Sequence, residues 1–175
     1  MTMNQRAQVI ALLPVVIFVA VTLIAERTTA QVLPSELEGL RAFKILVEPL
    51  DKEAESEQID ARTLENQVLV TIRSKAPGLR YDPGVIPYLY VNVNIMTSET
   101  SYSGNISLEL KRPVEVLIGV HRHGQTPSKR VWTVATVWDS SYTFRGGRGG
   151  GAAHVRTIMD LLLERFLADY FRGNP

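Results

Sequence analysis

An alternation of apolar and polar residues within residues 87–96 constrains the fold more than any other feature of the chain. One face of this segment is aliphatic and consists of Leu89, Val91, Val93 and Ile95. The other face consists of Tyr88, Tyr90, Asn92 and Asn94. A period of two residues is typical of a strand that buries one face, so the chain must contain a sheet whose apolar side is covered by other elements.

Three more segments show the same alternation and are predicted to be strands: residues 43–47, 106–118 and 131–138. A turn over residues 101–105, with Gly104 at its centre, makes 106–118 the hairpin partner of 87–96. Pro113 interrupts this second segment without ending it, which indicates a bulge or an edge position. In the last strand, Trp132 and Trp138 are predicted to share one side.

Two segments repeat apolar residues at helical spacing. The first has Leu64, Val68 and Ile72 on one face, with Asp60 as its N-cap and Pro77 just after its end. The second is a long C-terminal helix whose apolar stripe consists of Val155, Ile158, Met159, Leu162, Leu163, Phe166, Leu167 and Tyr170. Both stripes are expected to pack on the sheet.

These elements predict an α+β fold in the order strand, helix, three strands, helix. The expected arrangement is a four-stranded mixed sheet, mostly antiparallel, with both helices packed on one face. Residues 31–175 are predicted to form a single domain, which is long enough to bury about two thirds of its unfolded surface.

The N-terminal residues 1–30 predict export. Arg6 precedes an uncharged apolar run over residues 9–25, and the small residues Thr28, Thr29 and Ala30 then form the expected cleavage site. Residues 1–30 are therefore interpreted as a signal peptide, and the protein is expected to be periplasmic or secreted. The alternative is a retained inner-membrane anchor over residues 9–25, a run at the lower length limit for a membrane span.

Composition excludes several classes of function. The chain has no cysteine, which excludes lipid attachment at the leader, disulfides and thiolate chemistry. Without Arg6, Arg27 and Glu26, the chain from residue 31 carries 17 basic and 17 acidic residues, and this neutral balance argues against nucleic-acid binding. An acidic linker lacks the glycine and closing glutamate of a calcium loop, so a solvated loop is predicted there. Its acidic residues are Glu48, Asp51, Glu53, Glu55, Glu57 and Asp60.

The histidines do not indicate a metal site or a catalytic site. His121 and His123 offer two imidazoles around Arg122, but a typical zinc site needs more ligands than this. His154 precedes the last helix, and no nucleophile pattern supports pairing it with Ser140 or Ser141. No metal, cofactor or catalytic residue is predicted.

The glycine-rich residues 145–151 precede the last helix, whose N-terminus could hold an anion with help from Arg145 and Arg148. No phosphate-loop lysine or dinucleotide pattern accompanies them, so a flexible connection is the simpler interpretation.

Two surfaces are predicted to contact a partner. The first is the second sheet face with Tyr88, Tyr90, Asn92 and Asn94, because tyrosine offers a large apolar area with few rotors. An ordinary solvated sheet face is the alternative. The second is the basic loop that contains His121, Arg122, His123 and Arg130.

Several segments carry a resemblance to a known family. They are residues 87–95, residues 105–110, the strand end at Trp138 and Asp139, the glycine-containing connection and the final Phe-Leu-Ala-Asp-Tyr-Phe-Arg-Gly-Asn-Pro. Together these resemble a family of small uncharacterised exported bacterial proteins of the periplasm. The resemblance implies an exported α+β domain and no particular activity. The order of elements is also similar to that of small envelope proteins that accompany outer-membrane assembly and transport.

The sequence thus predicts a non-catalytic exported envelope protein that acts by binding, as an adaptor or accessory component. A candidate partner is an envelope protein, and no nucleic acid is expected. The alternative is a hydrolase of unrecognised type with a site near His154 or His121. The oligomeric state stays open, with dimerisation through an edge strand as one possibility.

Overall fold

The computed structural model describes residues 36–119 and 128–175. The predicted leader, the alternative anchor over residues 9–25 and the predicted contact residues His121, Arg122 and His123 lie outside the described residues. In the described part of the chain, no helix is long and apolar enough to cross a membrane.

Residues 36–119 and 128–175 form five strands and three helices. The strands are β1 (Ala42–Val47), β2 (Arg80–Tyr81), β3 (Tyr88–Thr97), β4 (Ser101–Gly119) and β5 (Ser128–Gly147). The helices are α1 (Lys52–Ser56), α2 (Ala61–Lys75) and α3 (Gly151–Gly173).

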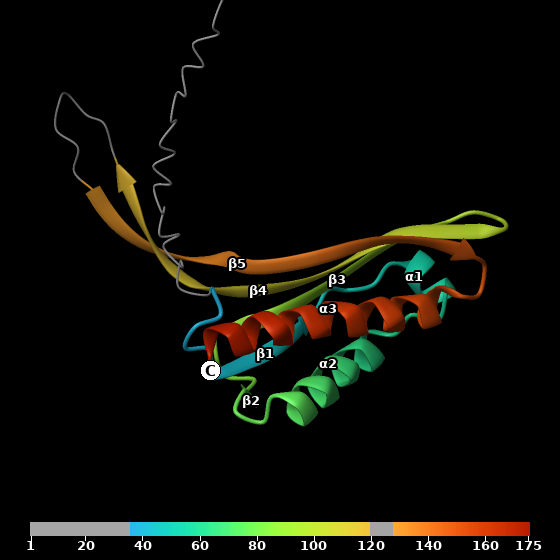
Figure 1. The fold of residues 1–175 in the computed structure, drawn as a ribbon. Coiled ribbons are helices and arrows are strands. Elements are labelled where there is room, and N and C mark those ends of the chain that lie inside the picture. Colours follow the sequence, from blue (N-terminus) through green and yellow to red (C-terminus); the bar gives the residue numbers. More distant parts are fainter. Residues whose placement is uncertain (1–35, 120–127) are drawn as a thin grey trace, which may run out of the picture. The chain divides into compact units, whose positions relative to one another are not determined.

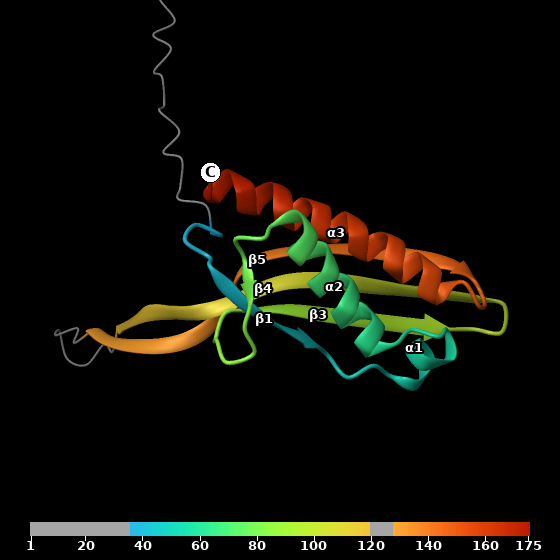
Figure 2. The same cartoon turned by 90° about the horizontal axis from the view of Figure 1, so that it is seen from below.

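The strands form one mixed sheet in the order β2-β1-β3-β4-β5. β1 pairs in parallel with β2 and β3, whereas β3, β4 and β5 pair antiparallel. Helices α2 and α3 lie on the same face of the sheet, and α1 lies beside the end of β3 (Figures 1 and 2). The α+β class and the mixed sheet are therefore confirmed.

The predicted count of four strands and two helices is wrong, because β2 and α1 are additional elements of the described residues. β2 has two residues, which is too short to show a period. α1 has five residues, and Ala54 is the buried residue among them, so it leaves no apolar stripe in the sequence. It lies within the linker that was predicted to be a solvated loop.

The predicted apolar stripes on β3, α2 and α3 all form the core, because every residue named for them is buried. α3 packs across β4 and β5, where the Trp138 ring meets Phe166 edge-on with 5.3 Å between ring centroids. The indole N–H of Trp138 also donates to the Asp169 carboxylate at 2.9 Å. The C-terminal helix is therefore fixed to the sheet by apolar packing and by a directional hydrogen bond.

Helix α2 begins and ends where the sequence predicts. Its N-cap Asp60 accepts hydrogen bonds from the backbone N–H and the hydroxyl of Thr63, both at 2.7 Å. These hydrogen bonds from Thr63 lower the pKa of Asp60. The helix ends at Lys75, two residues before Pro77.

The turn between β3 and β4 lies earlier than predicted. β4 already begins at Ser101, and Gly104 pairs with Ile95 on one side and with Phe144 on the other. A Cβ at position 104 would overlap the Asn94 carbonyl oxygen and come within 2.9 Å of the Phe144 ring. Gly104 is therefore required for close packing inside a strand and does not form a turn.

The pairing of β4 with β5 changes register between Leu110 and Lys111, which places a bulge close to the position predicted at Pro113. Leu110 pairs with Trp138 but Lys111 pairs with Thr136. An extra residue reverses the side that the following residues face. Trp138 is consequently buried, whereas Trp132 is 70% exposed, and the prediction that they share one side is wrong.

Beyond Lys111, β4 extends past the start of β3, which begins at Tyr88 opposite Lys111. Residues 112–119 and 128–135 therefore form a two-stranded ribbon, here called the arm, which extends beyond the helices (Figure 1). Pro113 lies within it, so the predicted edge position is confirmed. Arg130, which was assigned to a loop, belongs to β5.

Candidate binding surfaces

The open face, defined as the side of β1, β3 and β4 opposite α2 and α3, carries the predicted residues Tyr88, Tyr90, Asn92 and Asn94. Tyr88, Tyr90 and Asn92 are partly buried and Asn94 is exposed. Asn92 donates to the Glu48 carboxylate, and Asn94 donates to the side-chain oxygen of Asn92. The structure therefore brings the four predicted residues together, and it adds Glu48.

Charged side chains complete the open face. The Lys111 ammonium lies 4.2 Å from the Tyr90 ring centroid and 3.2 Å from the Glu109 carboxylate. Glu109 also accepts a hydrogen bond of 3.0 Å from the Thr136 hydroxyl. Polar groups of the open face are thus paired with one another, which favours a well-ordered solvated surface over an adhesive one.

Tyr90 is expected to ionise late in an alkaline titration. A hydrogen bond to Glu48, with burial and the charge of Glu48, raises its pKa to about 12. Because the folded pKa lies above the unfolded value of about 10, its contribution to stability is complete below pH ~10 and is lost as the pH rises towards 12. Absorbance titration of tyrosinate checks this: Tyr90→Phe should remove amplitude near pH 12. An unchanged titration in that range would contradict the assignment.

The arm differs from the open face because its large apolar side chains are exposed. The exposed residues are Val116 (40%), Leu117 (62%), Ile118 (47%), Trp132 (70%) and Val134 (47%). Cross-strand pairing divides them between the two sides of the ribbon. Large exposed apolar side chains gathered on one element are typical of binding sites, so the arm is a candidate contact surface.

Cations accompany these apolar residues. Lys129 and Arg130 lie on β5, opposite Ile118 and Leu117. Arg130 lies 3.6 Å from the carboxylate of Glu115, but its side chain remains 72% exposed, so this ion pair is weak. The arm therefore presents apolar area together with accessible positive charge.

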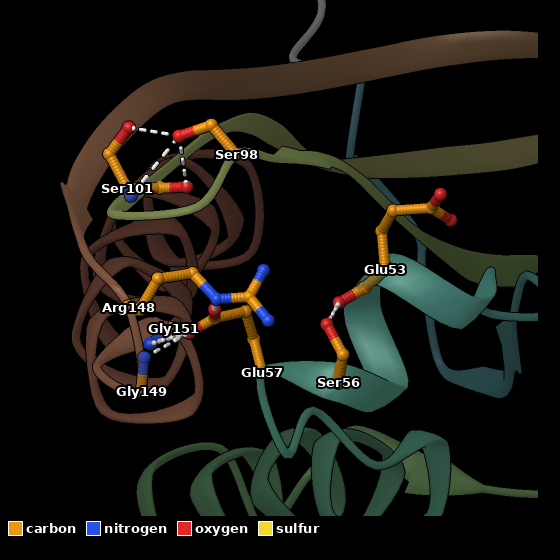
Figure 3. Close-up of polar contacts among 8 residues, drawn as sticks. All are labelled: Glu53, Ser56, Glu57, Ser98, Ser101, Arg148, Gly149 and Gly151. Atoms are coloured by element: carbon orange, nitrogen blue, oxygen red, sulfur yellow. Dashed lines mark hydrogen bonds and ion pairs between the residues drawn. The ribbon is translucent and has the colours of Figure 1, made fainter.

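The start of α3 already holds an internal anion (Figure 3). Glu57, predicted to be solvated, is 1% exposed. Its Oε2 atom accepts hydrogen bonds from the backbone N–H groups of Gly149 at 2.9 Å and Gly151 at 3.1 Å, and its Oε1 atom lies 3.2 Å from Nε of Arg148. We call this arrangement the Glu57 clamp. The carboxylate of Glu57 occupies the backbone N–H donors that the sequence suggested for an external anion. The segment is therefore not the flexible connection that was predicted.

His154 is packed among aromatic rings. Its Nδ1 atom lies 3.2 Å from the Tyr102 hydroxyl, and its ring centroid lies 5.5 Å from that of Phe144. Burial, followed by the charge of Glu57, raises the pKa of Tyr102. The hydroxyl of Ser140 is buried without a hydrogen-bond partner among the described residues, so no hydrogen bond joins it to His154.

A hollow of about 820 Å³ near the end of β3 is lined in part by His154, Asp51 and Arg145. Asp51 caps α1, because its carboxylate accepts the backbone N–H of Ala54 at 2.7 Å. The described residues contain no group of three or more potential metal ligands. Of the groups that line this hollow, Asp51 and His154 thus already have partners within the fold, in Ala54 and Tyr102.

Comparisons of the chain with protein-family models, with curated proteins and with solved structures found no match.

Proposed function

We propose that this chain is a non-catalytic exported envelope protein that works by binding, as an adaptor or accessory component, and that the arm is its principal contact surface. The observation that carries the proposal is the exposure of Leu117, Trp132 and Val134 on a ribbon that extends beyond the helices. The leader and the resemblance to small exported bacterial proteins support the envelope as the compartment.

The open face is assigned a smaller role. Tyr88 and Tyr90 interact with Lys44 and Lys111 through cation–π contacts, and Glu48 engages Tyr90 and Asn92. A partner that bound there would have to displace contacts that already satisfy these groups. Binding to the arm has no comparable cost, because burying its exposed aliphatic side chains away from water lowers the free energy.

Site-specific photocrosslinking in the native envelope tests the proposal. A photoreactive residue at Leu117 or Val134 is expected to label an envelope component, either protein or lipid. The matched control is Val70 of α2, which is 65% exposed but lies outside the arm. Labelling at the arm but not at Val70 supports a binding function. Absence of adducts from both arm positions would contradict it.

The double variant Tyr88→Ala with Tyr90→Ala separates the two surfaces. Because the open face is a secondary surface in this proposal, crosslinks from Leu117 should persist in this variant. Their loss would move the principal contact to the open face.

A further inference from the structure

The two sides of the arm are both apolar, unlike the two sides of the sheet from which it extends. Val116 and Ile118 continue the side that α2 and α3 cover elsewhere, and they pair with Val131 and Lys129. Leu117 and Trp132 lie on the opposite side, which continues the polar open face. A protein docked on one side would leave the other side in water. A medium that surrounds the ribbon would cover both sides.

Basic residues are concentrated in the segment that forms the arm. The segment 112–135 contains Arg112, Arg122, Lys129 and Arg130 against a single acid, Glu115. The rest of the chain from residue 31 then carries 13 basic and 16 acidic residues. In the described part of the arm, residues 112–119 and 128–135, Arg112, Lys129 and Arg130 outnumber the one acid, Glu115. The exposed apolar ribbon therefore carries a net positive charge. Apolar area combined with positive charge is complementary to an anionic lipid surface.

The unpaired strand edges of the arm limit how deeply it can insert into a lipid bilayer. The β4 edge beyond Lys111 is unpaired among the described residues, and its backbone N–H and C=O groups need water or another partner. Open strand edges do not occur in the hydrocarbon region of a bilayer. Trp132 is a side chain that favours the interface between lipid and water. These constraints favour insertion at the headgroup level and exclude a span.

We infer that the arm inserts into the interfacial region of a bilayer that contains anionic phospholipids, with Trp132, Leu117 and Ile118 as its apolar contacts and Lys129 and Arg130 facing the headgroups. This inference rests on the proposed function, because it names the partner of the same arm. A second copy of the chain is a poorer occupant, since pairing of two arms brings positively charged segments together.

Tryptophan fluorescence of the full chain tests this inference. The probes are vesicles of phosphatidylcholine alone and vesicles that also contain phosphatidylglycerol. Because the apolar leader also favours lipid, the readout must be local to the arm. Trp132 is exposed and Trp138 is buried, so a blue shift and quenching by a nitroxide attached to the lipid report on Trp132.

Blue shift and quenching are expected with the anionic vesicles. Neutralising Lys129→Gln with Arg130→Gln should weaken the response about thirtyfold. The matched control, Arg73→Gln with Lys75→Gln on α2, should leave it unchanged. Trp132→Phe should abolish it, and circular dichroism will show whether each variant retains the fold.

Three results would overturn the inference: no response to either vesicle, an equal response to both vesicles, or an arm-dependent dimer that forms without lipid. If the vesicle response is absent but Leu117 still crosslinks to an envelope protein, the lipid inference fails while the binding function stands. If neither response nor crosslink occurs, both fail.

Discussion

Replacing Glu57 with alanine is expected to lower the free energy of unfolding by roughly 3 kcal/mol. The variant leaves the N–H groups of Gly149 and Gly151 without their acceptor and removes the ionic partner of Arg148. It removes the side-chain contacts between the end of α1 and the start of α3 (Figure 3), whereas the hydrogen bond of 3.1 Å from the Ala152 N–H to the backbone carbonyl of Glu57 remains. Chemical denaturation monitored by circular dichroism measures the change.

Two further variants make this result specific. Glu57→Gln keeps an oxygen that can accept from the glycine N–H groups but loses the charge, so roughly half of the effect is expected. Glu53→Ala removes an exposed acid from α1 and should be close to neutral. Equal denaturation midpoints for the Ala variants at positions 53 and 57 would show that the clamp contributes no stability.

The second large effect is expected at Gly104. A Cβ there would overlap the Asn94 carbonyl oxygen, which is backbone and cannot rotate away, and would approach the Phe144 ring to 2.9 Å. Gly104→Ala should therefore destabilise the fold by about 2 to 3 kcal/mol through overpacking.

Gly78 provides the matched control for this substitution. A Cβ at Gly78 meets no atom within 4 Å, so Gly78→Ala is expected to be nearly neutral. Thermal unfolding of the two variants compares them directly. A melting temperature of Gly104→Ala equal to that of Gly78→Ala would show that the sheet adjusts freely at this position.

The long periodic elements could be predicted from the sequence because burial of one face imposes a repeat. The alternation around Val91 and Val93 identified β3, and the stripe that includes Met159 and Phe166 identified α3. The Asp60 cap located the start of α2 because a carboxylate there can satisfy free backbone donors. The short β2 and α1 escaped prediction because neither is long enough to show a repeat.

Bulges limited how well the sequence could predict which side of the sheet each side chain faces. The alternation along 131–138 placed Trp132 and Trp138 on the same side of the strand. A period of two residues assumes a regular strand and cannot show where an extra residue is inserted. The register change next to Lys111 reverses the sides and exposes Trp132. A glycine inside an alternating pattern is ambiguous in the same way, since it fits a turn or a close approach of strands, and Gly104 is the latter.

The Glu57 clamp could be predicted only in part. The sequence showed separately an acidic linker and a glycine-rich helix start with Arg148, and each half has the charge that the other needs. Nothing local indicated that they meet, because Glu57 and Gly151 are 94 positions apart. Of the predicted contact residues, the four on the open face do lie together, whereas Arg130 lies on the arm.

The long sequence separation between α3 and the elements that it covers determines when folding can finish. Glu57 and the inner surface of β4 and β5 must wait for α3, which is synthesised much later than Glu57, so a nascent chain lacking residues from 151 onward leaves this part of the sheet uncovered. Such late closure depends on contacts between distant segments, which form slowly. A chaperone that keeps the unfinished polypeptide from aggregating would therefore have to remain bound until α3 is available to pack on the sheet.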